Sequence, residues 1–305
     1  MKPFAYFSDG TPVPLDGQFH ADPLDPSNLI RCLEPWTPPG VSTIISGGNT
    51  AHVGLLPDGS VLKFPIDRLD SFSKKALDIE HCILSHLGEH NRIVRYLGRE
   101  EHGLRFQRAA KGDVRRYIQA IEPHIISPQL RIKWSTQAAE ALAFIHSRGV
   151  IHCDIHPNNF LLDDAFDLQL CDFSGSLFGN LDGTGMESIR FFLPRDPLAT
   201  PTIRSDLFAL GSTIYYIMSG CEPYDTLAES EVTARYTRGD FPAIDSIPCG
   251  RVIMSCWKRD VEDANEVFQA LSDEGPGLAV AGQVRGAISK SSPQCDSRSS
   301  AAACV

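Results

Sequence analysis

The residues best suited to chemistry lie in one segment, Val150 to Ser174, which reads VIHCDIHPNNFLLDDAFDLQLCDFS. Asp154 comes after a short apolar run, Asn159 follows it by five positions, and Asp172 comes after a second apolar run. A carboxylate such as Asp154 can orient a hydroxyl group or accept its proton. Asn159 and Asp172 offer the hard oxygen ligands that magnesium prefers. The residue types therefore suit a site that combines a reactive carboxylate with oxygen ligands for a metal ion.

This segment resembles the catalytic loop and the magnesium loop of the eukaryotic protein kinases, which read H-R-D-x-x-x-x-N and D-F-G. His152-x-Asp154 with Asn159 is similar to the first motif, and Asp172-Phe173 is similar to the second. Either fragment is common by chance, but both at this spacing are specific. The resemblance implies that Asp154 acts on the hydroxyl that attacks ATP, while Asn159 and Asp172 hold the magnesium that bridges the ATP phosphates.

The other parts of that family's site are expected upstream, and similar residues occur there in the same order. SGGNTAHV, residues 46–53, aligns with the loop G-x-G-x-x-G-x-V, with only the central Gly48 in register. Lys63 follows Val53 by ten positions and ends an apolar stretch, where the family has its phosphate-binding lysine. Glu80 follows seventeen positions later, where the family has the partner of that lysine. A solvated lysine and a surface glutamate are the alternative interpretations.

A further stretch, Leu104 to Val114, resembles the strand and hinge that hold adenine in this family. The resemblance implies that Phe106 is the gatekeeper and that the backbone of residues 107–109 bonds to the base. The residues expected to contact ATP are Gly47, Gly48, Val53, Lys63, Phe106, Gln107, Ala109 and Leu161. Those expected to act in catalysis are Asp154, Lys63, Glu80, His156 and Asn159, and the expected metal ligands are Asn159 and Asp172.

The elements that must position these residues can be read from apolar periodicity. From Val41 to Phe64, apolar stretches flank Gly- and Asp-rich turns, which is typical of hairpin-connected strands. One amphipathic helix is expected to begin at Ser73 and end at Gly88, and Ser127 is expected to start a second one. Asp206 begins an apolar helix that should be buried on all sides. The residues expected to point inward are Ala76, Ile79, Ile83, Leu84 and Leu87, then Ile132, Ala138, Leu142 and Ile145.

Later segments extend the resemblance to about residues 41–271. The sequence FFLPR stands where the family has Y-x-A-P-E, and CWKRD is similar to its C-W-x-x-D. The resemblance implies an α+β fold with two lobes. These are a small β-rich lobe with one helix, over about residues 41–108, and a larger helical lobe over about residues 109–271.

Five substitutions depart from the family pattern. Cys153 replaces the arginine that receives an activation-loop phosphate, so activity is expected not to be gated in that way. Ser174 replaces the glycine of D-F-G and is expected to cost backbone freedom. His156 replaces the catalytic-loop lysine, and it either donates a hydrogen bond in the site or merely packs in the loop. Arg195 replaces the glutamate of A-P-E, and Ala264 replaces its arginine partner. Both halves of a buried ion pair are thus missing together, which predicts a repacked fold.

Composition limits the class of protein. A hydrophobic content of 42% excludes wholesale disorder, and a net charge of −10 argues against a nucleic-acid partner. No apolar run reaches the roughly 18 residues of a membrane span.

The nine cysteines are scattered and form no Cys-x-x-Cys pair, which favours free thiols and an intracellular, cytoplasmic location. Residues 1–40 are expected to form an irregular lead-in in which Trp36 packs on the body, and residues 272–305 a disordered tail.

Three functions are compatible with these residues. The first is a serine/threonine protein kinase that uses ATP and magnesium on a protein substrate, a specificity favoured by Pro157 and by Ser188. The second is a pseudokinase that binds ATP as a scaffold, to which Ser174, His156 and the altered Gly-rich loop point. The third is a small-molecule kinase, because DIHP resembles the D-x-H-P loop of aminoglycoside and choline phosphotransferases.

Overall fold

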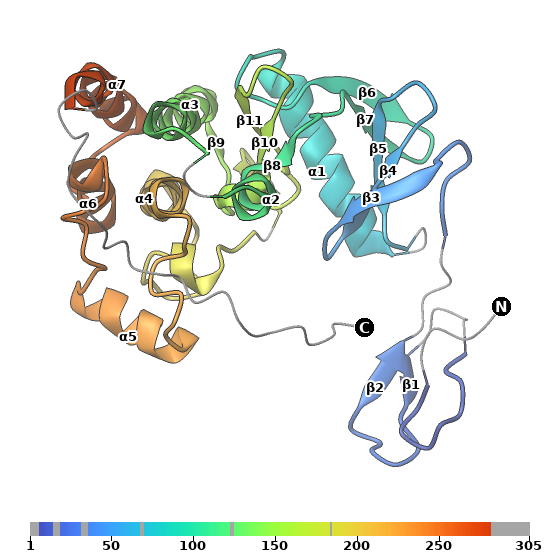
Figure 1. The fold of residues 1–305 in the computed structure, drawn as a ribbon. Coiled ribbons are helices and arrows are strands. Elements are labelled where there is room, and N and C mark those ends of the chain that lie inside the picture. Colours follow the sequence, from blue (N-terminus) through green and yellow to red (C-terminus); the bar gives the residue numbers. More distant parts are fainter. Residues whose placement is uncertain are drawn as a thin grey trace. The chain divides into compact units, whose positions relative to one another are not determined.

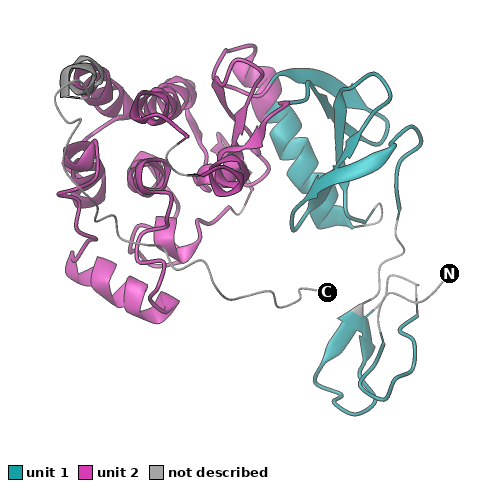
Figure 2. Ribbon diagram, viewed as in Figure 1, with its two compact units in different colours: residues 1–82, 95–108 teal, residues 83–94, 109–305 magenta. Residues whose placement is uncertain are grey.

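The computed structural model describes residues 6–14, 19–31, 36–67, 70–122, 125–183 and 185–281. The chain divides into two compact units, coloured separately in Figure 2. The small unit contains residues 1–82 and 95–108, and the large unit contains residues 83–94 and 109–305. Strands dominate the small unit and helices the large one, which confirms the expected α+β class with two lobes (Figure 1).

A five-stranded antiparallel sheet forms the body of the small unit, in the order β3-β4-β5-β7-β6 (Figure 1). The side chains of Leu62, Phe64, Leu104 and Phe106 are buried in this unit. The strands expected between Val41 and Phe64 are thus present, and Gly59 closes their second turn with φ of +86°. The strand bounds are β3 Thr43–Gly47, β4 Ala51–Leu55, β5 Val61–Pro65, β6 Tyr96–Glu100 and β7 Gly103–Phe106.

Helix α1, Ser71–Leu87, is the amphipathic helix expected here, and its five predicted inward residues are all buried. Its first turn is capped by Asp70 rather than by Ser73. The Asp70 carboxylate accepts hydrogen bonds from the backbone N–H and the hydroxyl of Ser73, at 2.9 and 2.7 Å. The helix therefore starts two residues earlier than predicted, because the aspartate satisfies donors that a serine cap would otherwise take.

The lead-in was expected to be irregular, and this expectation is wrong for part of it. Strands β1, Phe19–Ala21, and β2, Leu29–Arg31, pair as an antiparallel ribbon. Buried Asp22 accepts hydrogen bonds from the N–H and hydroxyl of Ser8, at 2.9 and 2.6 Å, and ties the ribbon to the preceding segment. The Pro- and Asp-rich composition therefore makes tight turns between short strands. Trp36 packs edge-on against Phe64 of β5, as expected.

In the large unit, helix α4 packs against both α3 and α6. Gly211 permits the close approach of α6, because a Cβ at this position would lie 2.7 Å from Cβ of Cys256. Trp257 of α6 donates a hydrogen bond to Ser212 of α4 at 3.0 Å. The helices are α2 Val114–Ala120, α3 Pro128–Ser147, α4 Ile203–Ser219, α5 Glu229–Arg238, α6 Gly250–Lys258 and α7 Ala264–Ala281, with short turns η1 Pro157–Asn159 and η2 Ile189–Phe191.

Helix α3 starts after the cap Ser127, as predicted, and its expected inward residues are buried. Helix α4 starts at Ile203, so Asp206 lies in its first turn rather than at its start. Helix α7 runs to Ala281, which corrects the expectation of disorder from residue 272. Residues 282–305 of the expected tail lie outside the described residues.

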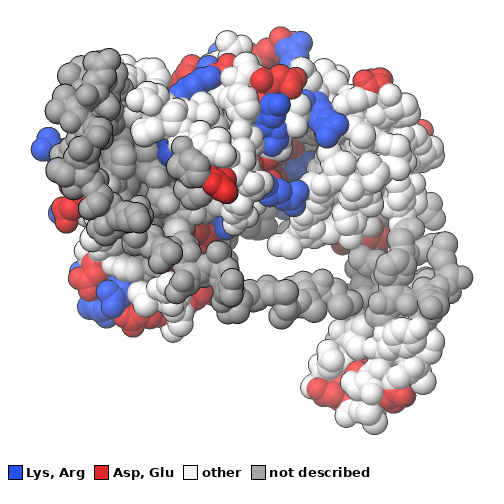
Figure 3. Space-filling model, in the orientation of Figure 1, with Lys and Arg blue, Asp and Glu red and all other residues white. Residues whose placement is uncertain are grey.

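Short strands complete the large unit in two small sheets, of order β11-β10-β8 and β13-β12-β9. Within the described residues, no helix is both long and apolar enough to cross a membrane. Acidic and basic side chains are interspersed over the large unit on the face drawn in Figure 3. The strands are β8 Gly112–Asp113, β9 Val150–Ile151, β10 Phe160–Leu162, β11 Leu168–Leu170, β12 Leu177–Phe178 and β13 Leu181–Asp182.

Candidate active site

In the small unit, the two residues expected to pair do so. The Lys63 ammonium nitrogen on β5 lies 2.5 Å from a carboxylate oxygen of Glu80 on α1. The Glu80 side chain is 1% exposed, so it is not a solvated surface glutamate. A buried carboxylate of this kind needs a compensating cation, and Lys63 supplies it. The pair fixes a positive charge at one place on the sheet.

The hairpin before Lys63 carries the residues expected to contact the phosphates. Gly47 ends β3 and Gly48 lies in the turn, where its N–H donates to the Ala51 carbonyl at 2.9 Å. Val53 of β4 lies directly opposite Lys63 of β5. Opposite residues of an antiparallel pair project from the same face, so Val53 and Lys63 share one face of the sheet.

The strand expected to lie beside adenine ends at Phe106. The Phe106 side chain is buried and packs against Tyr96, with the two ring centres 5.4 Å apart. Gln107 donates its backbone N–H to the Arg95 carbonyl at 2.9 Å. The Gln107 N–H is thus used within the small unit, and of its two backbone groups the carbonyl is the one that could serve a base. In the large unit, the Ala109 carbonyl accepts from Gly112 at 3.3 Å, and Leu161 is half-buried on β10.

The catalytic loop of the large unit is held by Asp206, a residue that sequence reasoning took only for a helix start. One carboxylate oxygen of Asp206 accepts from the N–H of His152 at 2.8 Å, and the other accepts from the N–H of Cys153 at 2.9 Å. His146 of α3 also lies 2.9 Å from this carboxylate. Asp206 is fully buried, and such charge-assisted bonds to backbone N–H groups are strong. They fix the turn at Cys153, where φ is +69°.

After this turn, Asp154 presents a carboxylate that is 37% exposed. The Asn159 amide donates to the Asp154 carbonyl at 2.8 Å and lies 3.4 Å from its carboxylate oxygen Oδ2. Nε2 of His156 lies 3.3 Å from the same oxygen. The loop thus brings together the three catalytic-loop residues singled out from the sequence, with an accessible carboxylate at their centre.

Asn159 and Asp172 are brought together by the hairpin of β10 and β11. The Cys171 N–H donates to the Asn159 carbonyl at 2.9 Å, so the residue after Cys171 lies beside Asn159. Because the Asn159 amide nitrogen is used by Asp154, its side-chain oxygen is the atom left for a ligand. Within the described ranges, no group of three His, Cys, Asp or Glu side chains could hold a metal. Magnesium needs only one or two protein oxygen ligands beside phosphates and water, so this donor set fits it.

The serine of the D-F-S motif does not strain the backbone as expected. The positive φ of this loop is at Asp172, at +64°, and Ser174 is not among the residues with positive φ. Instead, the Ser174 hydroxyl donates a hydrogen bond to Oδ1 of Asp172 at 2.6 Å. The substitution therefore acts on the orientation of the Asp172 carboxylate rather than on the main chain.

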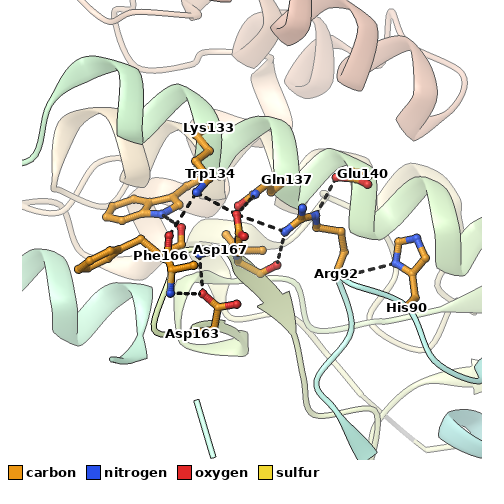
Figure 4. Close-up of polar contacts among 11 residues, drawn as sticks. His90, Arg92, Lys133, Trp134, Gln137, Glu140, Asp163, Phe166 and Asp167 are labelled. Carbon is orange, nitrogen blue, oxygen red and sulfur yellow. Dashed lines mark hydrogen bonds and ion pairs between the residues drawn. The ribbon is translucent and has the colours of Figure 1, made fainter. Parts of the chain in front are cut away.

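The turn at the far end of this hairpin is tied to helix α3, as Figure 4 shows. Asp167 accepts hydrogen bonds from Gln137 at 2.6 Å and Lys133 at 2.8 Å. The Lys133 ammonium group lowers the pKa of the Asp167 carboxyl, so the carboxylate stays charged. The indole N–H of Trp134 donates to the Phe166 carbonyl at 3.1 Å. These contacts hold the hairpin whose open end carries Asn159.

The sequence predicts that the family's glutamate–arginine pair is missing and that this part of the fold is repacked, and Arg195 has a different partner. Its guanidinium lies 2.8 Å from the carboxylate of Glu187, whose side chain is fully buried. Burial raises the pKa of Glu187, while Arg195 opposes that shift. Ala264 is buried at the place expected for a partner, but the pair has formed within the segment that contains Ser188. We call this Glu187–Arg195 pair the segment clamp.

Comparison with known proteins agrees with this arrangement. The family model described as "Protein kinase domain" matches residues 63–274. The human "Receptor-interacting serine/threonine-protein kinase 1" is 25% identical over 216 residues, covering 61% of this chain and 32% of that protein. "Aurora kinase" of Patiria pectinifera is 29% identical over 175 residues, covering 52% and 40%. The human "Receptor tyrosine-protein kinase erbB-4" is 26% identical over 285 residues, covering 85% and 22%. The chain thus spans less than half the length of these relatives. Their names include a serine/threonine kinase and a tyrosine kinase.

Proposed function

The chain belongs to the protein kinase family, and on that premise we propose that it is an active, ATP-dependent serine/threonine protein kinase. The observation that supports this most directly is the catalytic loop. Asp154 is accessible, its main chain is bonded to Asn159, and the turn before it is fixed by buried Asp206. Phosphoryl transfer needs little beyond such positioning and charge stabilisation.

In the proposed reaction, the substrate hydroxyl gives its proton to the Asp154 carboxylate. The hydroxyl oxygen forms a bond to the γ-phosphorus of ATP, and the bond from that phosphorus to the bridging oxygen breaks to release ADP. Lys63 would hold phosphate oxygens as a fixed cation whose position Glu80 sets. Asn159 and Asp172 would hold magnesium, which neutralises charge on the phosphates.

The preference for serine and threonine is part of this proposal. Pro157 begins the turn η1 inside the catalytic loop, and Ser188 comes immediately before η2. In the family that the chain resembles, a proline and a hydroxyl residue at these places accompany serine/threonine specificity. We also propose a protein as the substrate and an intracellular, cytoplasmic location. The six cysteines within the described ranges are all free thiols, which supports a reducing compartment.

A pseudokinase is the second candidate, and one specific contact favours it. The Ser174 hydroxyl donates a hydrogen bond to Oδ1 of Asp172, an oxygen of the carboxylate proposed to hold magnesium. If that bond persists in the presence of ATP, the metal would be held weakly and turnover would be slow. The third candidate, a small-molecule kinase, rests on the DIHP sequence alone.

One assay separates these candidates. Purified protein is incubated with magnesium, labelled ATP and a generic basic protein, and the phosphorylated amino acid is identified. We expect phosphoserine or phosphothreonine, abolished in the Asp154→Asn variant. Magnesium-dependent ATP binding without any transfer would favour the pseudokinase, and phosphotyrosine would overturn the proposed specificity.

A further inference from the structure

His156 is in direct reach of the catalytic carboxylate, and its ring geometry assigns it a role. We propose that His156 is a positioning residue that orients Asp154 through a neutral imidazole, and that it does not serve as a cation for the transferred phosphate. This inference rests on the proposed kinase function. It is independent of the sequence resemblance, which places a phosphate-contacting lysine at this position.

The first step is the protonation state of the ring. Nδ1 of His156 accepts a hydrogen bond from the backbone N–H of Asn158 at 3.2 Å and thereby caps the turn η1. A ring nitrogen that accepts a hydrogen bond carries no proton. The neutral ring must then carry its proton on Nε2, an assignment made from the hydrogen-bond network.

The second step is the position of that proton. Nε2 lies 3.3 Å from Oδ2 of Asp154, so the one N–H of the ring is next to the catalytic carboxylate. The Asn159 amide nitrogen lies 3.4 Å from the same oxygen. The Asn159 amide nitrogen and Nε2 of His156 therefore both lie beside Oδ2, which leaves Oδ1 to receive the proton of a substrate hydroxyl. Holding a general base by one oxygen fixes the direction in which the other points.

The third step is the packing around the ring. His156 is in extended backbone conformation, with φ of −160°, at the start of η1. The Phe191 ring of η2 packs edge-on against it, with the ring centres 6.1 Å apart. Among the described residues, the ion-pair contact of this ring is with Asp154, and its ring contact from η2 is with the uncharged Phe191.

An imidazolium would fit this place less well. Protonation of Nδ1 would set one N–H donor against the N–H of Asn158, because both would then be donors and the cap would be lost. A phosphate-binding role requires that charged form, whereas a positioning role requires only the proton on Nε2. The two roles therefore require different protonated forms of the ring.

Two substitutions separate the two ring nitrogens. In His156→Asn the side-chain oxygen replaces Nδ1, so the cap on Asn158 is kept and the donor to Asp154 is lost. In His156→Gln the amide nitrogen reaches the place of Nε2, so the donor is kept and the cap is lost. We expect His156→Asn to keep the parent melting temperature while kcat falls about tenfold or more, with the KM for ATP little changed. We expect His156→Gln to melt earlier and to lose less of its kcat. His20→Asn, outside the family match, is the matched control and should leave both unchanged.

Equal kcat in His156→Asn and the parent would overturn the proposal, since a purely structural histidine needs only the cap. A rise in the KM for ATP with kcat unchanged would overturn it too, because that result indicates a phosphate contact.

The tautomer can be measured without any turnover. Nitrogen chemical shifts of ¹⁵N-histidine-labelled protein at pH 8, with the His156 signal identified by its loss in His156→Gln, should show a proton on Nε2 and none on Nδ1. A proton on Nδ1 overturns the inference even in an active kinase. A parent protein that shows the expected tautomer but transfers no phosphate would refute the proposed function and leave the assigned ring geometry upheld.

Discussion

The Lys63 ammonium group lies 2.5 Å from Glu80, inside a unit whose sheet and helix bury that carboxylate almost completely. In Lys63→Met the chain keeps a side chain of similar length and loses the charge. Turnover should fall at least tenfold, since a fixed cation no longer stabilises the phosphate oxygens. The expected loss is measured as kcat with saturating magnesium and ATP.

Glu80→Gln is a second test of the same pair. It removes the carboxylate partner and should lower kcat while Lys63 is still present. Phosphorylation by Lys63→Met at the parent rate would contradict the role given to this pair.

Asp172 and Asn159 lead to a second prediction, that nucleotide binding requires a divalent cation. ATP with magnesium should raise the melting temperature of the parent, and chelator should remove most of that shift. Asp172→Ala should lose it as well. Ser174→Ala keeps both ligands but removes the 2.6 Å hydrogen bond to Oδ1 of Asp172. If that bond competes with the metal, Ser174→Ala should show a larger shift than the parent. Equal stabilisation in chelator would rule out these metal ligands.

Single residues also show where sequence reasoning ends. Lys63 and Glu80 could be paired in advance, since their spacing and the resemblance both placed them. The support that Asp206 gives to the catalytic loop could not, because it joins residues more than fifty positions apart. Its one signal in the sequence is an aspartate at the head of an otherwise apolar helix. A buried charge of this kind must have partners, and the sequence does not say which.

Among the elements, those with strong local signals were predicted most accurately. Helices α1 and α3 followed from a 3.6-residue apolar period and from polar residues at their starts. The ribbon of β1 and β2 was missed because its strands are three residues long and lie among turn residues, which carry little periodicity. Helix α7 was cut short because glycine and serine composition was taken as disorder. The segment clamp was missed because the resemblance showed only that the family's ion pair is absent. It gave no sign that Arg195 would pair with Glu187 instead.

The segment clamp carries a prediction at the scale of its element. Arg195→Met alone would leave the buried Glu187 carboxylate without its partner, and Glu187→Leu alone would leave the Arg195 guanidinium unpaired. Each should lower the free energy of unfolding by about 3 kcal/mol, since an uncompensated buried charge is costly. The double variant buries no charge and should lose much less than the sum. Chemical denaturation of the four proteins measures the coupling. Strictly additive losses would show that the two side chains do not act as a pair.

For the whole molecule, the sequence predicted the class of fold better than it predicted the ends of the chain. The order of strands first and helices afterwards, with a resemblance over about residues 41–271, was sufficient for two lobes. The family match confirms membership over residues 63–274. The lead-in was treated as separate from the fold, yet Trp36 packs on the sheet while residues 19–21 and 29–31 pair as a ribbon of their own. That division could not be predicted, because it depends on which surface each apolar side chain meets.

Two truncations test this division of the lead-in. Trp36 packs against Phe64 and against the ring of His102, at 5.8 and 5.6 Å between ring centres. Val41 covers Gly54 so closely that a Cβ there would lie 2.3 Å from it. Deleting residues 1–31 removes the ribbon alone and should leave the melting temperature and kcat near those of the parent. Deleting residues 1–41 also removes the packing of Trp36 and Val41 and should cost about 1–3 kcal/mol of unfolding free energy. The substitution Trp36→Ala in the full chain should reproduce much of that loss, because its ring covers part of the sheet.

If both truncated proteins have the melting temperature of the parent, the contacts of residues 36–41 contribute nothing to stability. An equal loss in both would instead show that the ribbon itself braces the small unit.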